Sequence, residues 1–208
     1  MEDIILFYFF VIKMVTRVSS SIICSTLYTI SISSEGEVYS WGNSPYGAHG
    51  HSNHDSHPIS FPTLIPNLYN IVSVSCGKSH SACLDNGGNV FCFGSNSNGQ
   101  LGVGVLGFKR TLFGKKKINN THVPQKVEVP PIKEISCGNS YTFCLSEDGE
   151  LYCFGENSMG QLGNGEVGND IITPHKLDVP SNIDFIACGG NHTLCKSFDN
   201  EIFYLGRE

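Results

Sequence analysis

The sequence predicts an all-β protein built from tandem repeats, and three observations lead to that prediction. Glycine is abundant, with 23 residues in a chain of 208, as expected where many short strands are joined by tight turns. Charged residues make up only 15% of the chain and aromatic residues 11%, which disfavours disorder, coiled coils and helical bundles. Similar stretches of about fifty residues follow one another, a period typical of propeller blades or solenoid turns.

Two series of residues define the repeat. Cysteines mark one phase, at Cys24, Cys76, Cys137 and Cys188, and glycines mark another, at Gly42, Gly94, Gly155 and Gly206. The intervals between successive members are the same in both series, which is very unlikely to arise by chance. We therefore expect tandem units over residues 18–69, 70–130, 131–181 and, in part, 182–206, after an apolar N-terminal segment (1–17) to which no role is assigned.

Each unit is expected to hold at least three short strands. The first precedes a Cys-Gly pair, at residues 71–74, 132–135 and 183–186. The second follows that pair, at residues 80–84 and 141–145. After a glycine turn comes a third strand rich in β-branched and aromatic residues, at residues 38–41, 90–93, 151–154 and 202–205, as hairpins require. The glycine-rich element that comes next cannot continue a strand and is predicted to be a shaped loop.

The motifs of these units closely resemble the regulator-of-chromosome-condensation repeat family. The residues that carry the resemblance, predicted to have structural roles in the repeat, are Gly77, His80, Gly94, Gly99, Gln100, Leu101, Gly102, Gly138, Gly155, Gly160, Gln161, Leu162, Gly163, Gly189, His192 and Gly206. The resemblance spans about residues 18–206 and implies β-propeller blades. The family's propeller has seven blades, so about three and a half units correspond to an incomplete propeller, about half of one. The first unit departs from the pattern, with Gly47-Ala48-His49-Gly50 in place of Gly-Gln-Leu-Gly and Tyr28 at the histidine phase.

The nine cysteines recur in phase with the repeat, which indicates packing positions. Their number is odd and no Cys-x-x-Cys occurs, so reduced, buried thiols are expected rather than disulfides or zinc ligands. Reduced thiols favour an intracellular compartment, cytoplasmic or nuclear. Secretion is not excluded, because residues 4–12 form an apolar run of signal-peptide length.

Histidines supply the weak candidates for a metal site. His49, His51, His54 and His57 lie close together in the sequence, and imidazoles at such spacing can share a divalent ion. The favoured alternative is a flexible polar loop without preorganised ligands, so no metal and no other cofactor is expected. His80 and His192 occupy the histidine phase of the repeat, which favours packing and hydrogen bonding between blades.

The second unit contains an insertion with a cluster of basic residues. Residues 103–122 include Lys109, Arg110, Lys115, Lys116 and Lys117, on a chain whose net charge is −6. Either a solvated loop or a binding site for an acidic partner or phosphates would suit this composition. The acidic balance of the whole chain excludes a polybasic mode of binding to nucleic acid or membranes.

No pattern of catalytic residues emerges, so the chain is predicted to be a protein–protein interaction module rather than an enzyme. The family resemblance implies one alternative, guanine nucleotide exchange on a Ran-like small GTPase, because the founding member accelerates nucleotide release from Ran. A further alternative is a fragment of a larger multidomain signalling or ubiquitin-ligase protein, in which such repeats also occur. An incomplete propeller exposes its terminal blades, so self-association through open blade edges is also expected.

Overall fold

A computed structural model describes residues 21–44, 46–51, 58–111, 114–117, 119–179 and 182–206. Every regular element in this part of the chain is a β-strand, from β1 to β17, which confirms the all-β prediction. Over the same residues, no helix is long and apolar enough to cross a membrane. The apolar N-terminal run lies outside the described residues.

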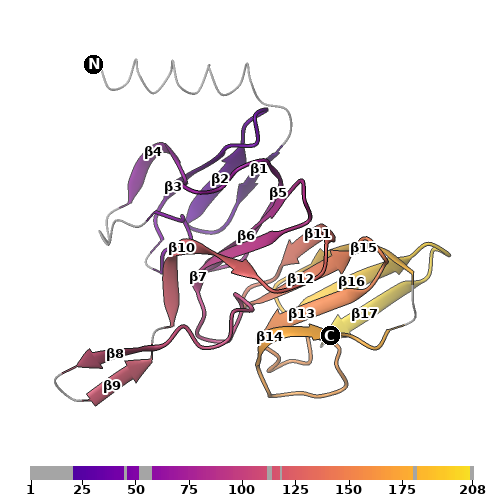
Figure 1. Ribbon diagram of the computed structural model, residues 1–208. Helices are drawn as coiled ribbons and strands as arrows, with labels where there is room; N and C mark the ends of the chain where they lie inside the picture. The colour runs from indigo at the N-terminus through magenta and orange to yellow at the C-terminus, as the bar shows by residue number, and fades with distance from the viewer. Residues whose placement is uncertain are drawn as a thin grey trace.

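Four antiparallel sheets follow one another along the chain (Figure 1). The first contains β1 (Ser21–Cys24), β2 (Tyr28–Ile32), β3 (Val38–Gly42) and β4 (Ile59–Leu64). The second contains β5 (Ile71–Cys76), β6 (His80–Asp85), β7 (Val90–Ser95) and β10 (Asn120–Val127). The third contains β11 (Ile132–Cys137), β12 (Tyr141–Ser146), β13 (Leu151–Gly155) and β14 (Ile171–Lys176). The fourth contains β15 (Ile183–Cys188), β16 (His192–Ser197) and β17 (Ile202–Gly206).

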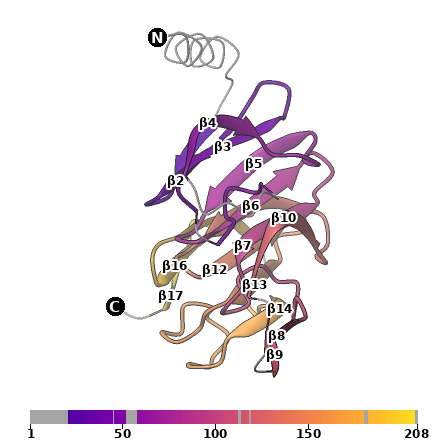
Figure 2. The ribbon, with the colours of Figure 1, turned by 90° about the vertical axis from the view of Figure 1, so that its left-hand side faces the viewer.

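The sheets are propeller blades that pack face to face. The first strands of successive blades, β1, β5, β11 and β15, are neighbours in space, and Figure 2 shows the blades stacked side by side. Between each pair of blades lies an apolar cluster; in the first, Ile30 and Val38 of one blade meet Val74 and Phe93 of the next. Alternate residues of a strand point to opposite faces, so each inner blade buries both of its faces against a neighbour. The stability of a blade therefore depends on the blades beside it.

The sequence analysis did not identify the fourth strand of each complete blade. β4, β10 and β14 each contain a proline, at Pro62, Pro124 and Pro174. In each case the register with the neighbouring strand shifts across the segment that holds the proline. Proline lacks a backbone N–H and is tolerated in edge strands and bulges, so the outermost position of the blade accommodates it.

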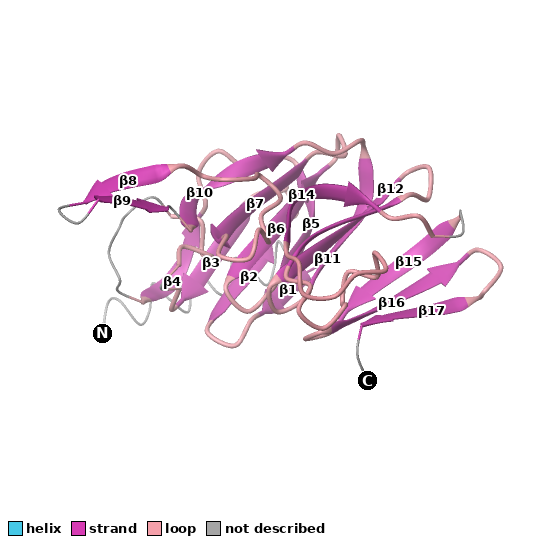
Figure 3. Cartoon of the chain, turned by 90° about the horizontal axis from the view of Figure 1, so that it is seen from below, coloured by secondary structure: helices cyan, strands magenta, loops and turns pink. Residues whose placement is uncertain are grey.

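The basic insertion forms a hairpin where a loop was expected. β8 (Phe108–Thr111) pairs with β9 (Gly114–Lys117) in a separate two-stranded sheet, which projects from the blades in Figure 3. The register places Lys109 across from Lys116 and Arg110 across from Lys115. Charged residues do not prevent strand pairing at a solvated edge, where lysine is a common protection against further pairing. A run of lysines is equally common in loops, so the sequence did not predict this hairpin.

Candidate interaction surface

The alternating strand directions divide the loops of the protein between two faces. The turn between the first and second strands and the loop after the third strand leave each blade at the same end, because neighbouring strands are antiparallel. We call this end the hairpin face, since β8 and β9 belong to one of its loops. The turns between second and third strands lie at the other end, called the opposite face.

Charge is distributed unequally between these two faces. In the described loops of the hairpin face the basic residues are Lys78 and the five basic positions of β8 and β9. The acidic residues of the same loops are Glu156, Glu166 and Asp170. The opposite face carries most of the described carboxylates: Glu35, Glu37, Asp85, Glu128, Glu147, Asp148, Glu150, Asp178, Asp199 and Glu201. The lysines Lys126, Lys133, Lys176 and Lys196 offset only part of that charge. The hairpin face is therefore the one suited to an acidic partner.

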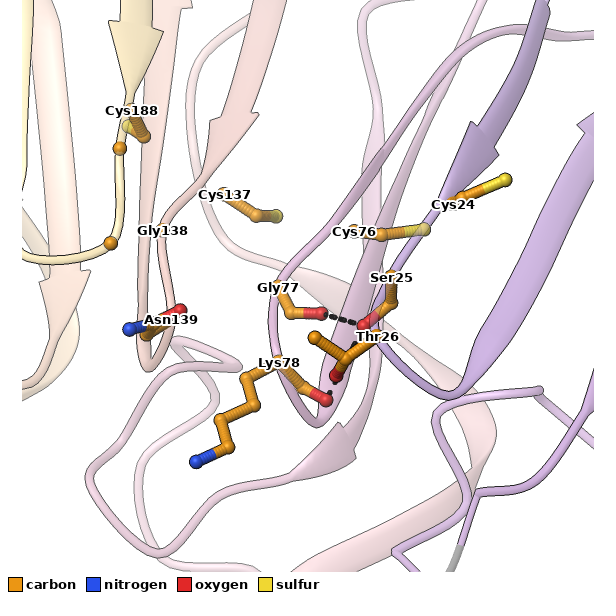
Figure 4. A pocket seen from close by; sticks show the side chains of 12 residues that line it. Cys24, Ser25, Thr26, Cys76, Gly77, Lys78, Cys137, Gly138, Asn139 and Cys188 are labelled. Carbon is orange, nitrogen blue, oxygen red and sulfur yellow. Dashed lines mark hydrogen bonds between the residues drawn. The ribbon is translucent and has the colours of Figure 1, made fainter.

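A groove of about 640 Å³ runs along the inner turns of the hairpin face. Its lining comes from the same positions of four successive blades: Cys24, Ser25, Thr26, Cys76, Gly77, Lys78, Cys137, Gly138, Asn139, Cys188, Gly189 and Gly190 (Figure 4). Ser25 Oγ donates a hydrogen bond to the carbonyl of Gly77 at 2.8 Å. The backbone N–H of Lys78 donates to Asn139, and that of Asn139 to Gly190. Lys78 is the one charged residue in the lining. The groove therefore presents mainly small side chains and polar backbone groups.

Serine–cysteine contacts tie the inner strands of the blades together. The N–H of Cys137 donates to Ser75 Oγ, and the N–H of Cys188 donates to Ser136 Oγ, both at 2.9 Å. The thiols of the same cysteines donate to the carbonyls of Ser75 and Ser136, at 3.6 and 3.5 Å. The sequence analysis missed these serines, although both directly precede a cysteine of the repeat, at Cys76 and Cys137.

The histidine phase of the repeat supplies a second contact between blades. Tyr28 Oη donates to the carbonyl of His80, and Tyr141 Oη to that of His192, each at 2.6 Å. His80 Nε2 lies 2.9 Å from Thr142 Oγ1 of the next blade. His80 is fully buried, whereas His192 is exposed and stacks on Tyr204 of its own blade.

The predicted repeat glycines lie at close approaches or in turns that need a positive φ. A Cβ on Gly77, Gly138 or Gly189 would lie within 2.4 Å of the ring of His80, Tyr141 or His192. Gly94, Gly99, Gly102, Gly155, Gly160, Gly163 and Gly206 all have positive φ. These ten positions therefore need glycine for steric and conformational reasons.

The Gly-Gln-Leu-Gly loops are folded by their own side chains. Leu101 and Leu162 are fully buried between blades. The side-chain oxygens of Gln100 and Gln161 accept from the N–H groups of Asn98 and Met159. A buried asparagine that the sequence analysis missed completes each loop, because Asn96 and Asn157 accept from the N–H groups of Leu101 and Leu162 at 3.1 Å.

The structure describes two of the four weak metal candidates, and it buries them. His49 and His51 are 3% and 8% exposed, so the expectation of a flexible polar loop is wrong at these positions. His51 Nε2 lies 2.9 Å from Ser40 Oγ, and His51 N–H donates to His49 Nδ1. Burial, with His51 and His122 nearby, lowers the pKa of His49 to about 4. His54 and His57 lie outside the described residues, and within the described part no group of three or more His, Cys, Asp or Glu side chains could hold a metal ion.

All nine cysteines are free thiols, and six of them are buried. Burial raises the pKa of Cys83, Cys92 and Cys144 well above the usual range. Burial also raises the pKa of Cys76 to about 12, although side-chain hydrogen bonding with Tyr28 and Ser81 opposes the shift. A thiol acts as a nucleophile in its thiolate form, so these residues are structural.

The fold, the glycine loops and the repeat phase together identify the family. A family model described as "Regulator of chromosome condensation (RCC1) repeat" matches residues 35–84, 87–145 and 148–195. A second model of the same repeat matches residues 71–100 and 132–161. The chain belongs to the regulator of chromosome condensation repeat family. Each longer RCC1 repeat joins the outer strands of one blade to the inner strands of the next, as residues 35–84 contain β3 to β6.

Curated relatives with RCC1 repeats are longer than this chain. The ultraviolet-B receptor UVR8 of Arabidopsis thaliana is 30% identical over 192 residues, which cover 89% of this chain and 41% of UVR8. Human protein RCC2 is 30% identical over 211 residues, which cover 86% of this chain and 37% of RCC2. The chain thus spans about two fifths of the length of these relatives.

Solved structures show the same propeller fold. The crystal structure of yeast RCC1 (Prp20) bound to Kap60 superimposes with a TM-score of 0.76 at 30% identity, covering 90% of this chain and 41% of that one. A structure of Prp20p from Saccharomyces cerevisiae, studied with its binding to Gsp1p and histones, gives a TM-score of 0.74 at 19% identity, covering 91% and 44%. The blades of this chain therefore correspond to an incomplete RCC1 propeller.

Proposed function

We propose that this chain is a protein–protein interaction module that docks an acidic partner on its hairpin face. The observation that supports the proposal is the segregation of charge. Lys109, Arg110, Lys115, Lys116 and Lys117 fall in one hairpin on the hairpin face, while most described carboxylates belong to the opposite face. An uneven charge distribution steers a partner of opposite charge and fixes its orientation. The role requires no catalytic step and no cofactor.

Replacement of the five basic residues of the hairpin by serine tests this proposal. We expect the variant to bind an acidic probe peptide much more weakly than the parent does. Any binding that remains should not depend on salt concentration, because salt screens the attraction between exposed charges and the variant lacks the charges concerned. The free energy of unfolding should stay within about 0.5 kcal/mol of the parent value, the usual range for surface changes. Titration at several salt concentrations and urea unfolding provide the two measurements.

Serine replacement of Lys126, Lys133 and Lys196 on the opposite face is the matched control. That variant should bind the acidic peptide as the parent does. Equal loss of binding in both variants would indicate a general charge effect, and unchanged binding in the hairpin variant would rule out the hairpin as the docking site.

A second candidate function is guanine nucleotide exchange on a Ran-like small GTPase. Identity of 30% to yeast RCC1 over most of this chain supports it, and yeast Prp20p has been studied for its binding to Gsp1p and histones. Exchange would require a surface that favours the nucleotide-free GTPase over the loaded form. Release of a fluorescent guanine nucleotide from a panel of small GTPases, with and without this protein, tests this candidate directly.

We further propose that these blades act within a larger assembly inside the cell, in the nucleus or the cytoplasm. The human ligase HERC5 is 36% identical over 141 residues, a stretch that makes up 13% of HERC5. This likeness supports the alternative of a repeat region in a multidomain signalling or ubiquitin-ligase protein. Free thiols at all nine cysteines suit a reducing compartment. Fractionation of cells that produce the full natural protein would test the compartment.

A further inference from the structure

The turn between β6 and β7 contains a chemically labile pair of residues. Asn86 and Gly87 occupy the two central positions of this turn, which the N–H of Gly88 closes by donating to the carbonyl of Asp85 at 3.1 Å. At the same positions the other three blades have Ser34-Glu35, Glu147-Asp148 and Phe198-Asp199. In an Asn-Gly pair the glycine nitrogen can attack the side-chain carbonyl of asparagine, because glycine has no Cβ to obstruct the approach. Among these four turns, the one in the second blade is therefore open to this reaction.

Both reacting groups are accessible in the folded protein. The side chain of Asn86 is exposed, and no residue in the described part of the chain forms a hydrogen bond with it. It lines a groove of about 330 Å³, which gives the side chain room to rotate and admits water. Gly87 is also exposed, and its N–H donates to Asp85 Oδ1 at 2.9 Å within the same turn. Among the described contacts, ring closure has this one surface hydrogen bond to break.

The other two Asn-Gly pairs of the sequence are held more firmly. They are Asn98-Gly99 and Asn164-Gly165. Asn98 Nδ2 donates to Asp170 Oδ2 at 2.9 Å, and a Cβ on Gly99 would lie 2.6 Å from Ile172 Cα. Asn164 Oδ1 accepts from Nδ2 of Asn157, a fully buried side chain, at 2.9 Å. These contacts must open before either pair can cyclise, so the fold favours reaction at Asn86.

The Asn86 turn also joins the second blade to both of its neighbours. The N–H of Asn86 donates at 3.0 Å to the carbonyl of Asn70, in the segment that leads from the first blade to the second. The carbonyl of Gly88 accepts at 3.0 Å from the N–H of Ile132, the first residue of β11 in the third blade. A Cβ on Gly88 would lie 2.9 Å from that nitrogen, so the fit is close. Lengthening the backbone between Asn86 and Gly88 would therefore displace these contacts.

We propose that Asn86 is a site of spontaneous covalent modification, at which the folded protein forms isoaspartate. The nitrogen of Gly87 forms a bond to Cγ of Asn86 while the bond from Cγ to the side-chain nitrogen breaks. Ammonia leaves with the proton that the Gly87 nitrogen gives up, and a succinimide ring remains. Water then opens the ring at one of two bonds of that nitrogen. Cleavage at the backbone carbonyl carbon of residue 86 gives isoaspartate, and cleavage at Cγ gives aspartate.

Isoaspartate adds one methylene to the main chain and one negative charge to the turn. The hydrogen bonds to Asn70 and Ile132 lie on either side of the added methylene, so both neighbouring blades hold the second blade less firmly after the reaction. The free α-carboxylate of isoaspartate is the group that protein-isoaspartate methyltransferases methylate, and this class of enzyme is the partner that the site implies. The turn lies on the opposite face, so the proposal does not depend on an acidic partner at the basic hairpin.

The three Asn-Gly pairs can be compared within one sample. The folded protein is incubated at physiological temperature and mildly alkaline pH, and peptide mass spectrometry follows deamidation at each pair. We expect Asn86 to react roughly tenfold faster than Asn98 and Asn164, the factor that one additional hydrogen bond supplies. In guanidinium chloride the three rates should become similar, because the local sequence is the same. Methyl transfer by a purified protein-isoaspartate methyltransferase should label the peptide that contains residue 86.

Two variants separate the reaction from its consequence. Gly87→Ala should lower the rate at Asn86 to that of Asn98 and Asn164, because the methyl group obstructs the attack. The turn accepts this change, since the nearest atom to a Cβ on Gly87 is Asn89 Nδ2 at 3.2 Å, on a side chain that can move. Asn86→Asp is the matched control for charge, because it adds the carboxylate without the methylene. The incubated protein should unfold at a lower denaturant concentration than both the fresh parent and Asn86→Asp.

Several results would overturn the proposal. Equal rates at the three pairs in the folded protein would do so, as would an unchanged rate in Gly87→Ala. An incubated protein that unfolds at the same denaturant concentration as Asn86→Asp would overturn the effect on the blades. The order of rates should persist in the variant Phe185→Lys with Leu194→Lys. Loss of that order would show that contact between copies, rather than the fold, protects the slower pairs.

Discussion

At the scale of single residues, the glycine after each inner-strand cysteine has a steric cause that the sequence does not reveal. In the third blade the ring of Tyr141 lies against Gly138, and a Cβ on Gly138 would lie 1.9 Å from that ring. Tyr141 cannot move away freely, because its hydroxyl donates to the carbonyls of His192 and Gly189 in the next blade. The glycine therefore permits the contact that holds two blades together.

Gly138→Ala should destabilise the protein by about 1–3 kcal/mol, the usual cost of overpacking a buried site. Gly190→Ala is the control, because the nearest atom to its Cβ would be Asn139 Nδ2 at 3.1 Å, on a side chain that can move. That change should cost less than about 0.5 kcal/mol. Urea unfolding followed by circular dichroism measures both values, and equal costs would contradict the steric explanation.

The cysteines should be distinguishable by their access to solvent. Cys24 is exposed and six others are buried with raised pKa. A maleimide reagent should label Cys24 first in the native protein and all nine thiols after denaturation, as counted by intact-mass spectrometry. Rapid native labelling of Cys83, Cys92 or Cys144 would show that the blades open more readily than their packing indicates.

At the scale of elements, the contact between the second and third blades should depend on pH. His80 is fully buried, and burial lowers its pKa to about 4. Its Nε2 contacts Thr142, whereas Nδ1 has no hydrogen-bond partner among the described residues. Protonation would therefore bury a charged N–H without an acceptor. Because the folded pKa lies below the unfolded value near 6.5, this contribution to stability is complete above pH 6.5 and is lost as the pH falls toward 4.

His80→Tyr isolates that effect, since Tyr28 and Tyr141 occupy the same position in neighbouring blades. Between pH 7 and pH 4.5 the parent should lose about 2–3 kcal/mol more stability than the variant. Urea unfolding at both pH values measures the difference, and the acid sensitivity of His49 is common to the two proteins. Equal losses would mean that His80 stays neutral or finds an acceptor.

At the scale of the whole molecule, the fourth blade exposes an apolar face. Phe185, Leu194 and Ile202 are 50%, 40% and 72% exposed. The residues that correspond to Leu194 in the earlier blades, Ile30, Ala82 and Phe143, are fully buried against the next blade. Exposed apolar surface of this kind favours association.

The isolated chain should therefore self-associate or be only marginally stable. Phe185→Lys with Leu194→Lys should shift it toward monomers, because charge on this face opposes contact between copies. Size exclusion with light scattering gives the measurement, and the same double change on the solvated residues Glu35 and Glu147 is the control. A monodisperse 22.7 kDa parent that unfolds cooperatively would contradict the prediction.

The sequence by itself determined the repeat, the presence of at least three strands in each unit and the family. These follow from local features: the alternation of apolar residues, glycine where φ is positive, and the constant phase of Cys-Gly and Gly-Gln-Leu-Gly. The fourth strand was not predictable in the same way, because a proline interrupts its pattern. Only the outermost position in the sheet makes Pro62, Pro124 and Pro174 acceptable there.

Tertiary structure alone decided what each repeated residue does. His80 and His192 occupy the same position of the motif, yet one is fully buried against Thr142 and the other is exposed. His49 and His51 look like residues of a polar loop, but both are buried: the ring of His49 lies beside His122 of the second blade, and His51 contacts Ser40 of its own blade. The physical reason is that the burial of a side chain is a property of the surface that covers it, and in a propeller that surface belongs to the neighbouring blade.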